Sequence, residues 1–254
     1  MSELSLKYSG SLLSTIDSAQ AKSSSPPRQL DGLGGLPICW SGAAPSMPAK
    51  TWVRQVQLGL KRLFDMFAAT LALIVLLPLM LSVGALIRIG DGGPVLFRQK
   101  RVGQGGRVFE ALKFRSMHAA AGDPSGMIEA VVNDGRVTPL GRFLRRSGID
   151  ELPQLWNILI GDMSLVGPRP HVPGMRAAGV VYEDLVHGYA FRTSMRPGLT
   201  GWAQCHGLRG STVDRHKSIA RIAHDFAYIQ NFSLLLDMKI LAITARREFF
   251  KFSE

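Results

Sequence analysis

Two adjacent carboxylates, Asp150 and Glu151 in "SGIDELPQLWNILIG", are the residues best suited to chemistry. Neighbouring residues on a helix point about 100° apart, so the pair cannot share one proton and we expect two different roles. At the start of a helix that ends near Gly161, both would feel the positive end of the helix dipole and stay ionised, ready to bind a cation or act as a nucleophile. A purely structural explanation competes, because Ser147 and Asp150 match a helix-capping box.

Arginines surround this acidic pair along the chain. Arg145 lies just upstream, Arg169 lies in "GPRP" and Arg196 begins "RPGLTG". Because the planar guanidinium group makes paired, charge-assisted hydrogen bonds to phosphate, these residues are candidates for binding a diphosphate. Ionised carboxylates and a diphosphate repel each other unless a cation lies between them, so the expected cofactor is Mg²⁺. Taken singly, each arginine is also compatible with an ordinary surface ion pair.

Other classes of site find little support in the sequence. The six histidines lack metal-ligand spacing, and the two cysteines, Cys39 and Cys205, are too far apart for a zinc or redox motif. No P-loop is present, and "VGQGG" falls in a predicted turn rather than between a strand and a helix, which excludes a kinase or dehydrogenase. The net charge of +11 requires an acidic partner, which is nucleic acid, anionic lipid or a phosphorylated substrate.

The element with the clearest signal is an uncharged run over residues 66–87, "MFAATLALIVLLPLMLSVGALI". It is long enough to cross the hydrocarbon core of a bilayer. Both flanks are basic, and since Lys and Arg concentrate on the cytoplasmic side, we expect both ends to stay in the cytoplasm. The helix would then be re-entrant and bent at Pro78, which lacks a backbone donor. An ordinary spanning helix with a tolerated proline is the alternative.

The elements around the acidic pair are short. A β-hairpin over 94–99 and 107–114 would bring Lys113 and Arg115 close to the membrane surface, although isolated strand cations are usually just solvated. Residues 118–135 are expected to form a loop or lid. Thr138 and Pro139 begin a short helix that closes near Gly148.

Two longer helices are expected in the C-terminal part of the chain. One covers 219–229, and the other covers 234–250 with Ser233 as its cap. Their basic faces suit either a membrane surface or ordinary solvent.

The predicted fold class is α+β and mostly helical, with a proline-broken re-entrant membrane helix, a small β-hairpin, short catalytic helices and amphipathic surface helices. At 254 residues the chain allows one catalytic domain. Residues 1–50, rich in Ser, Gly and Pro, are expected to be a disordered tail. Residues 51–90 form an amphipathic lead-in and the re-entrant membrane helix, and 91–254 form the cytoplasmic catalytic domain.

Several motifs occur in a fixed order: "KRLFD", "GPVLFRQKRVG", "KFRSM", "IDELPQLWNILIGDMSLVGPRP" and "RPGLTGWAQ". Together they resemble the bacterial sugar transferase family, the monotopic polyprenyl-phosphate phosphoglycosyltransferases, over roughly residues 58–250. The resemblance implies transfer of a phosphosugar from a UDP-sugar to polyprenyl (undecaprenyl) phosphate, with release of UMP. It also implies a place in the bacterial inner membrane, with the catalytic domain on the cytoplasmic face, at the first membrane step of exopolysaccharide or surface glycan synthesis.

The resemblance also implies roles for individual residues. Asp150 would attack the diphosphate and carry a covalent phosphosugar, and Glu151 would engage Mg²⁺. The implied substrate-binding residues all lie in the matching motifs: Lys113, Arg115, Arg145, Gln154, Arg169 and Arg196. Pro78 matches the proline at the family's helix break.

Two departures from the family pattern stand out. Leu77 precedes Pro78 where the family commonly has Ser, and Cys205-His206-Gly207 replaces a frequent Val-Asn-Gly. A membrane-tethered basic binding protein and an inactive scaffold for polysaccharide assembly are the alternatives. Nucleic acid is not an expected partner, because the cations cluster around turns and carboxylates rather than among stacking aromatics. The sequence leaves the sugar open, as well as the oligomeric state, a homo-oligomer included.

Overall fold

The computed structural model describes residues 29–33, 36–39, 45, 51–119, 121 and 134–251. The α-helices are α2 (Trp52–Asp91), α3 (Pro139–Ser147), α4 (Gln154–Ile160), α5 (Tyr182–Leu185), α6 (Trp202–Cys205), α7 (Arg215–Gln230) and α8 (Leu234–Lys251). The strands are β1 (Gln29–Leu33), β2 (Leu36–Cys39), β3 (Leu96–Val102), β4 (Val108–Phe114), β5 (Ser164–Val166), β6 (Arg176–Ala177), β7 (Val180–Val181) and β8 (Gly198–Thr200). The described part is therefore mostly helical, with small two-stranded sheets.

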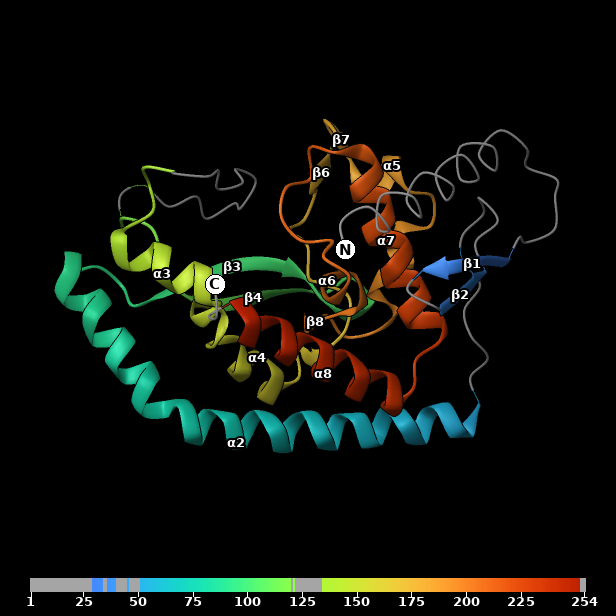
Figure 1. The fold of residues 1–254 in the computed structure, drawn as a ribbon, viewed down its shortest axis with the longest axis horizontal. Coiled ribbons are helices and arrows are strands. Elements are labelled where there is room, and N and C mark those ends of the chain that lie inside the picture. Colours follow the sequence, from blue (N-terminus) through green and yellow to red (C-terminus); the bar gives the residue numbers. More distant parts are fainter. Residues whose placement is uncertain are drawn as a thin grey trace.

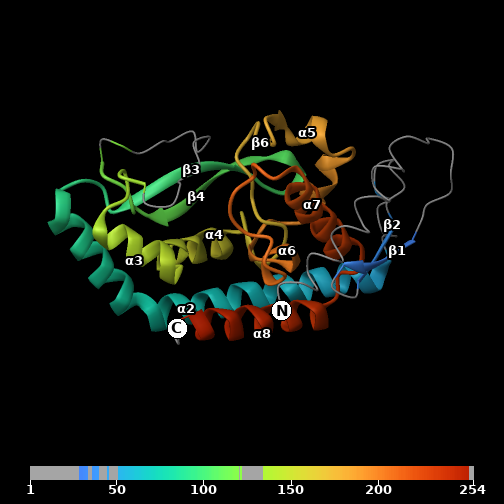
Figure 2. The same cartoon turned by 45° about the horizontal axis from the view of Figure 1, so that its top comes forward.

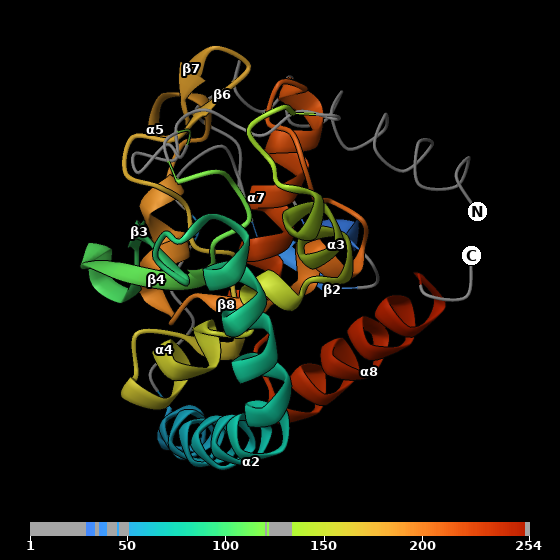
Figure 3. The ribbon, with the colours of Figure 1, turned by 90° about the vertical axis from the view of Figure 1, so that its left-hand side faces the viewer.

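Helix α2 runs along one side of the molecule, and the rest of the chain packs on the inner side of its bend (Figure 1). It is 40 residues long and apolar enough to cross a membrane. Figure 2 shows α8 lying next to the first arm of α2, and Figure 3 shows α4 on the other side of that arm. Helices α4 and α8 thus contact the apolar helix directly.

The bend in α2 lies in the half of the helix that contains Pro78 (Figure 1). Proline removes one backbone donor and crowds the preceding turn, which is a sufficient cause for a bend. The Ser82 hydroxyl, one turn after Pro78, donates a hydrogen bond to the Pro78 carbonyl oxygen at 2.9 Å. The course of α2 through a bilayer stays a prediction.

The β3–β4 hairpin pairs antiparallel from Leu96 opposite Phe114 to Val102 opposite Val108. The second strand lies where the sequence placed it, whereas the first begins at Leu96 and continues to Val102. Pairing extends that far because the chain reverses only at Gln104–Gly106, where Gly105 and Gly106 adopt positive φ angles of 67° and 78°.

The short and C-terminal helices follow their sequence signals closely. Thr138 caps α3 by accepting a 2.9 Å hydrogen bond from the Gly141 amide, and Gly148 ends the helix in the left-handed conformation. Ser233 accepts a bond from the Leu236 amide at the start of α8. Helix α7 is buried along most of its length and forms the main hydrophobic core with α6 and α8, so its role is packing.

Two short strands lie within the segment expected to be a disordered tail. Strands β1 and β2 pair antiparallel, with Gln29 opposite Cys39, and both contact α7. The disorder of residues 1–50 stays a prediction. Apart from Pro45, the remaining residues of 1–50 lie outside the described residues, as does most of the loop expected at 118–135.

Candidate active site

The acidic pair lies in a 3₁₀ turn, Ile149–Glu151, between the end of α3 and the start of α4. Gly148, with φ at 72°, reverses the chain just before it. The Ser147 hydroxyl donates backwards to the Phe143 carbonyl oxygen at 2.9 Å and the Leu144 carbonyl oxygen at 3.1 Å. Ser147 therefore belongs to the last turn of α3, and the competing explanation of Ser147 and Asp150 as a capping box is wrong.

Glu151 lies between two cations that come from distant parts of the chain. Lys113 Nζ, from β4, lies 2.7 Å from Glu151 Oε1. Arg169, from the loop after β5, places Nη2 2.6 Å from the same oxygen and Nη1 3.4 Å from Oε2. Burial alone would raise the pKa of Glu151, but the charges of Arg169 and Lys113 outweigh it and hold that pKa far below its usual range. Glu151 is therefore permanently ionised.

Asp150 differs from its neighbour in every respect that matters for reactivity. Burial, together with the negative charge of Glu151, raises the pKa of Asp150 to about 6, although Lys113 partly opposes the shift. No residue in the described part of the chain donates a hydrogen bond to its carboxylate or pairs with it within 4 Å. At neutral pH Asp150 is an ionised carboxylate without a strong partner, which is the state that a nucleophile needs.

The site carries more positive than negative charge. Lys113 and Arg169 are matched by Glu151, and Arg101 adds another guanidinium nearby, whose pKa falls only to about 10, chiefly through burial and then through the charge of Arg169. Arg145 also acts on Asp150 by lowering its pKa. An excess of arginine and lysine beside two carboxylates suits an anionic substrate such as a diphosphate.

The predicted substrate-binding residues do not all meet at this point. Lys113 and Arg169 contact Glu151 directly, whereas Arg145 is exposed at the end of α3. Gln154 is buried at the start of α4. The roles of Arg145 and Gln154 in substrate binding stay predictions.

Arg115 and Arg196 lie apart from the acidic pair. Arg115 forms an ion pair with Asp91 at the end of α2. Arg196 donates through Nε to the Gly161 carbonyl oxygen at 3.0 Å, at the end of α4. Both side chains hold elements together, and their predicted role in substrate binding also stays a prediction.

The loop that carries Arg169 is fixed by a parallel pairing that the sequence did not reveal. Strands β5 and β8 pair from Ser164 with Gly198 to Val166 with Thr200. Gly167 then approaches the second strand so closely that a Cβ atom on it would lie 2.4 Å from the Arg196 carbonyl oxygen. The "GPRP" and "RPGLTG" motifs therefore lie side by side, and only glycine fits at the contact.

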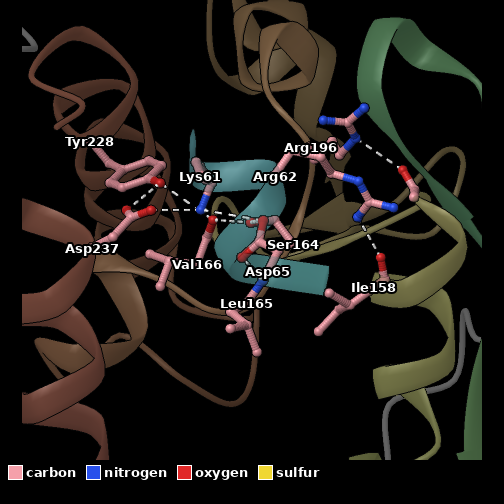
Figure 4. A network of polar contacts seen from close by, with 11 residues as sticks. Lys61, Arg62, Asp65, Ile158, Ser164, Leu165, Val166, Arg196, Tyr228 and Asp237 are labelled. Atoms are coloured by element: carbon pink, nitrogen blue, oxygen red, sulfur yellow. Dashed lines mark hydrogen bonds and ion pairs between the residues drawn. The ribbon is translucent and has the colours of Figure 1, made fainter. Parts of the chain in front are cut away.

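A buried polar cluster joins α2 to the elements of the site (Figure 4). Lys61 Nζ lies 2.6 Å from Asp237 Oδ2 and 3.8 Å from Asp65 Oδ2, and the Tyr228 hydroxyl donates to Asp237 Oδ1 at 2.7 Å. Asp65 accepts bonds from the hydroxyl of Ser164 at 2.7 Å and from the backbone amide of the next residue at 3.1 Å. We call these five side chains the anchor cluster. It ties the apolar helix to β5, the strand that leads to Arg169.

Arg62 forms a second connection from α2. Its guanidinium donates to the carbonyl oxygen of Ile158 at 2.6 Å (Figure 4) and to that of Leu159 at 2.8 Å, at the end of α4. The Ile158 oxygen also accepts from the Gly161 amide at 3.2 Å. In the sequence, Lys61 and Arg62 of "KRLFD" belong to the basic flank of the apolar run, and these contacts were not predicted. Apart from the 3.8 Å contact between Lys61 and Asp65, the partners lie 96 to 176 residues away in the chain, so a local pattern does not identify them.

The residues present fit a Mg²⁺ ion if a bound diphosphate supplies most of its oxygen ligands. Among the described residues, no group of three or more His, Cys, Asp or Glu side chains converges. Glu151 Oε1 accepts two strong bonds, while Oε2 accepts only the 3.4 Å bond from Arg169. Mg²⁺ often takes one or two protein carboxylates and completes its shell with water and substrate phosphates. The site fits such an ion, with Glu151 Oε2 as the candidate protein ligand and a diphosphate as the main source of oxygen ligands.

Comparison with known proteins places this geometry in a family. Residues 56–251 match the model of the bacterial sugar transferases. The chain is 50% identical over 186 residues to an exopolysaccharide production protein of Rhizobium leguminosarum bv. phaseoli, covering 73% of this chain and 93% of that protein. It is 45% identical over 190 residues, 75% of this chain, to an undecaprenyl-phosphate glucose phosphotransferase of Komagataeibacter xylinus.

A further relative is a UDP-glucose:undecaprenyl-phosphate glucose-1-phosphate transferase of Escherichia coli, 42% identical over 190 residues, which are 75% of this chain. The chain spans only 36% of the Komagataeibacter protein and 40% of the Escherichia protein, in contrast to nearly all of the Rhizobium protein. The match covers all but the first four residues of α2, both carboxylates, Lys113 and Arg169. The chain therefore belongs to the bacterial sugar transferase family and is a phosphoglycosyltransferase.

Proposed function

We propose that the chain transfers a sugar 1-phosphate from a UDP-sugar to undecaprenyl phosphate, as the first membrane step of a bacterial exopolysaccharide or related surface glycan. The observation that carries the proposal is the division of the acidic pair. Asp150 is ionised and unpartnered among the described residues, while Glu151 is held between Lys113 and Arg169. The names of the Komagataeibacter and Escherichia relatives support the lipid phosphate as acceptor, and the latter supports a UDP-sugar as donor.

The reaction proceeds in two displacements at one phosphorus atom. An Asp150 carboxylate oxygen attacks the β-phosphorus of the UDP-sugar, a new P–O bond forms, and the bond from that phosphorus to the bridging oxygen breaks. UMP leaves with the bonding electron pair, and the enzyme retains the phosphosugar as an acyl phosphate on Asp150. An oxygen of undecaprenyl phosphate then attacks the same phosphorus, the bond to Asp150 breaks, and the carboxylate is regenerated.

The neighbouring residues bind and orient the reacting groups in this scheme. Arg169 and Lys113 hold Glu151 beside Asp150. In this scheme their positive charges also stabilise the negative charge that develops on the leaving phosphate. A Mg²⁺ ion bound with the diphosphate would neutralise phosphate charge and make the leaving UMP a better leaving group. Because the first displacement needs no lipid, the phosphosugar forms on Asp150 before undecaprenyl phosphate reacts.

We further propose that α2 enters and leaves the cytoplasmic leaflet of the inner membrane, bent at Pro78. The bend, the apolar length of α2 and the basic residues on both flanks support this topology. Cysteines placed singly at Trp52 and Lys100, both exposed, test it with a membrane-impermeant maleimide. Both should react in inverted vesicles and neither in right-side-out vesicles; reaction from opposite sides would establish a spanning helix.

The proposed reaction is tested by incubating membranes that contain the chain with undecaprenyl phosphate and a panel of UDP-sugars, and measuring UMP release. The UDP-sugar that releases UMP in step with a new lipid-linked sugar identifies the donor. Membranes with Asp150→Asn serve as the control and should release none. If the wild-type chain releases no UMP with any donor while remaining folded and inserted, it is an inactive scaffold or a binding protein instead.

A further inference from the structure

The backbone of the "GPRP" loop and of the residue after it is fixed by hydrogen bonds to four consecutive carbonyl oxygens. Two bonds come from backbone amides: Gly198 N donates to the carbonyl oxygen of residue 168 at 3.0 Å, and Val102 N to that of residue 171 at 2.9 Å. Two come from arginine side chains: Arg192 Nη2 donates to the carbonyl oxygen of residue 169 at 2.7 Å, and Arg101 Nη1 to that of residue 170 at 2.9 Å. A loop that is bonded at each residue cannot shift without breaking several bonds at once. The direction of the Arg169 side chain is therefore set by these donors.

Arg192 is the donor that reaches the backbone of Arg169 itself. Its guanidinium is 6% exposed and uses all three nitrogens: Nη2 to the Arg169 carbonyl oxygen, Nε to Asp225 Oδ2 at 2.8 Å and Nη1 to the Tyr189 hydroxyl oxygen at 3.1 Å. Asp225, on α7, is equally buried, with a side chain 3% exposed. A charged pair that is removed from water and bonded on every guanidinium nitrogen favours one geometry, because moving it would leave buried charge unsatisfied.

A third group closes this arrangement. The Tyr189 oxygen accepts from Arg192, so its proton is directed to His171 Nδ1, 2.7 Å away. Burial lowers the pKa of His171 well below its usual value, and the surrounding arginines lower it further, so its ring is neutral and can accept that proton. The loop is thus bonded at two places: Arg192 binds the carbonyl oxygen of Arg169, and Tyr189 binds the side chain of His171.

We propose that Arg192, fixed by Asp225, is a positioning residue that holds the Arg169 guanidinium against Glu151 in the geometry needed for transfer. The inference rests on the proposed function, because it assigns Arg192 no contact with substrate. Arg192 acts only through Arg169. Sequence reasoning missed it, since Arg192 lies 23 residues from Arg169 and 33 from Asp225 along the chain.

The test is a double-mutant cycle between Arg192 and Arg169, measured as UMP release, in the presence of undecaprenyl phosphate, from the UDP-sugar that the panel identifies as donor. Arg192→Ala alone should lower kcat about 10²-fold, the scale expected when a group is misplaced by about 1 Å. In a chain that already carries Arg169→Ala, the same change should lower kcat less than about twofold. An equal loss in both backgrounds would show a general structural role and overturn the proposal.

The variant Arg192→Lys separates a loss of positioning from a loss of folding. Lysine keeps a positive charge for Asp225 but cannot reach three acceptors at once, so its thermal midpoint should lie near the wild-type value while kcat stays at least about tenfold low. Full recovery of kcat would contradict positioning by the three-way guanidinium contact.

Arg221→Ala is the matched control. Arg221 is also 6% exposed and lies on α7, but it donates to the Leu208 and Gly210 carbonyl oxygens in another loop. It should lower the thermal midpoint like Arg192→Ala and show no coupling to Arg169. Strong coupling of Arg221 to Arg169 would overturn a specific role for Arg192.

A readout without turnover separates this inference from the proposed function. Arg169→Ala should lower the thermal midpoint of the wild-type chain, because it breaks the Glu151 ion pair, and lower it less in the presence of Arg192→Ala. If the wild-type chain releases no UMP from any UDP-sugar, the proposed function fails, and the thermal cycle still decides the inference. Equal thermal losses in both backgrounds would refute it.

Discussion

The anchor cluster and the active site use the same kinds of residues for opposite purposes. In the anchor cluster, both oxygens of Asp65 and both oxygens of Asp237 accept a bond from a neighbouring donor. In the active site, Glu151 is satisfied in the same way, but no described residue donates to Asp150. The proposal that Asp150 is the nucleophile rests on this difference between carboxylates that donors hold and one that they leave free.

The two regions also depend on each other. The anchor cluster fixes α2 to β5, and β5 leads into the loop that carries Arg169. Arg62 fixes α2 to the end of α4, whose beginning lies next to the acidic pair. The apolar helix is therefore part of the frame that positions the site.

The largest effect is expected from Asp150→Asn. Asparagine keeps the size of the side chain but removes the nucleophilic oxygen charge, so UMP release should fall by roughly 10⁴-fold or more. The control is Asp65→Asn in the anchor cluster, which should lower the thermal midpoint and leave kcat of the folded protein within about tenfold. Equal losses of kcat in the two variants would mean that the regions are not functionally distinct.

The next largest effect is expected from breaking the anchor cluster. Lys61→Met leaves two buried carboxylates without their cation, which should cost about 3–5 kcal/mol of unfolding free energy. Thermal unfolding in nanodiscs should show a midpoint lower by roughly 6–20 °C. Arg98→Met is the matched control, because the Arg98–Glu110 pair is exposed, with side chains 67% and 53% accessible, and such pairs contribute less than about 1 kcal/mol.

The dependence of activity on pH should distinguish the two carboxylates of the site. Asp150 must be ionised to attack, and its pKa is raised to about 6, so kcat/KM should fall about tenfold per pH unit below that value. Glu151→Gln removes a negative charge that raises the pKa of Asp150, so the acidic limb of its residual activity should move to lower pH. An unchanged limb in Glu151→Gln would assign the titration to another group.

The smallest effect concerns stability. A carboxyl group whose pKa is higher in the folded state favours folding below its unfolded pKa and loses that contribution as the pH rises through the folded value. Asp150 therefore destabilises the fold above pH 6, and Asp150→Asn should gain about 1–2 kcal/mol at pH 7.5, allowing for solvent screening. The gain should shrink as the pH falls towards 4. A constant gain at all pH values would show that ionisation of Asp150 is not its cause.

Local signals in the sequence located most of the elements. The caps of α3 at Thr138 and Gly148, the cap of α8 at Ser233, and the apolar run in α2 all act within a few residues, and the structure has them in place. Arg115 illustrates the limit of local reasoning. Strand alternation predicts that it shares a face with Lys113, but β4 ends at Phe114, so Arg115 leaves the strand pattern and pairs with Asp91 instead.

Contacts between distant segments were beyond the reach of local patterns. The parallel pairing of β5 with β8 joins strands of three residues each, too short to show a period. The partners of Lys61 and Arg192 are likewise set by tertiary packing alone. Asp150 and Glu151 were found as a pair, yet their opposite pKa shifts depend on the fold: burial raises the pKa of Asp150, whereas the charges of Arg169 and Lys113 lower that of Glu151.

The central claim is that Asp150 carries the phosphosugar between the two half-reactions. Purified protein in nanodiscs, incubated with a UDP-sugar identified by UMP release and without undecaprenyl phosphate, should gain the mass of one sugar phosphate in intact-mass spectrometry. Peptide mapping should place that mass on Asp150, and addition of undecaprenyl phosphate should remove it. Turnover without any such adduct, or an adduct that persists in Asp150→Asn, would contradict the account.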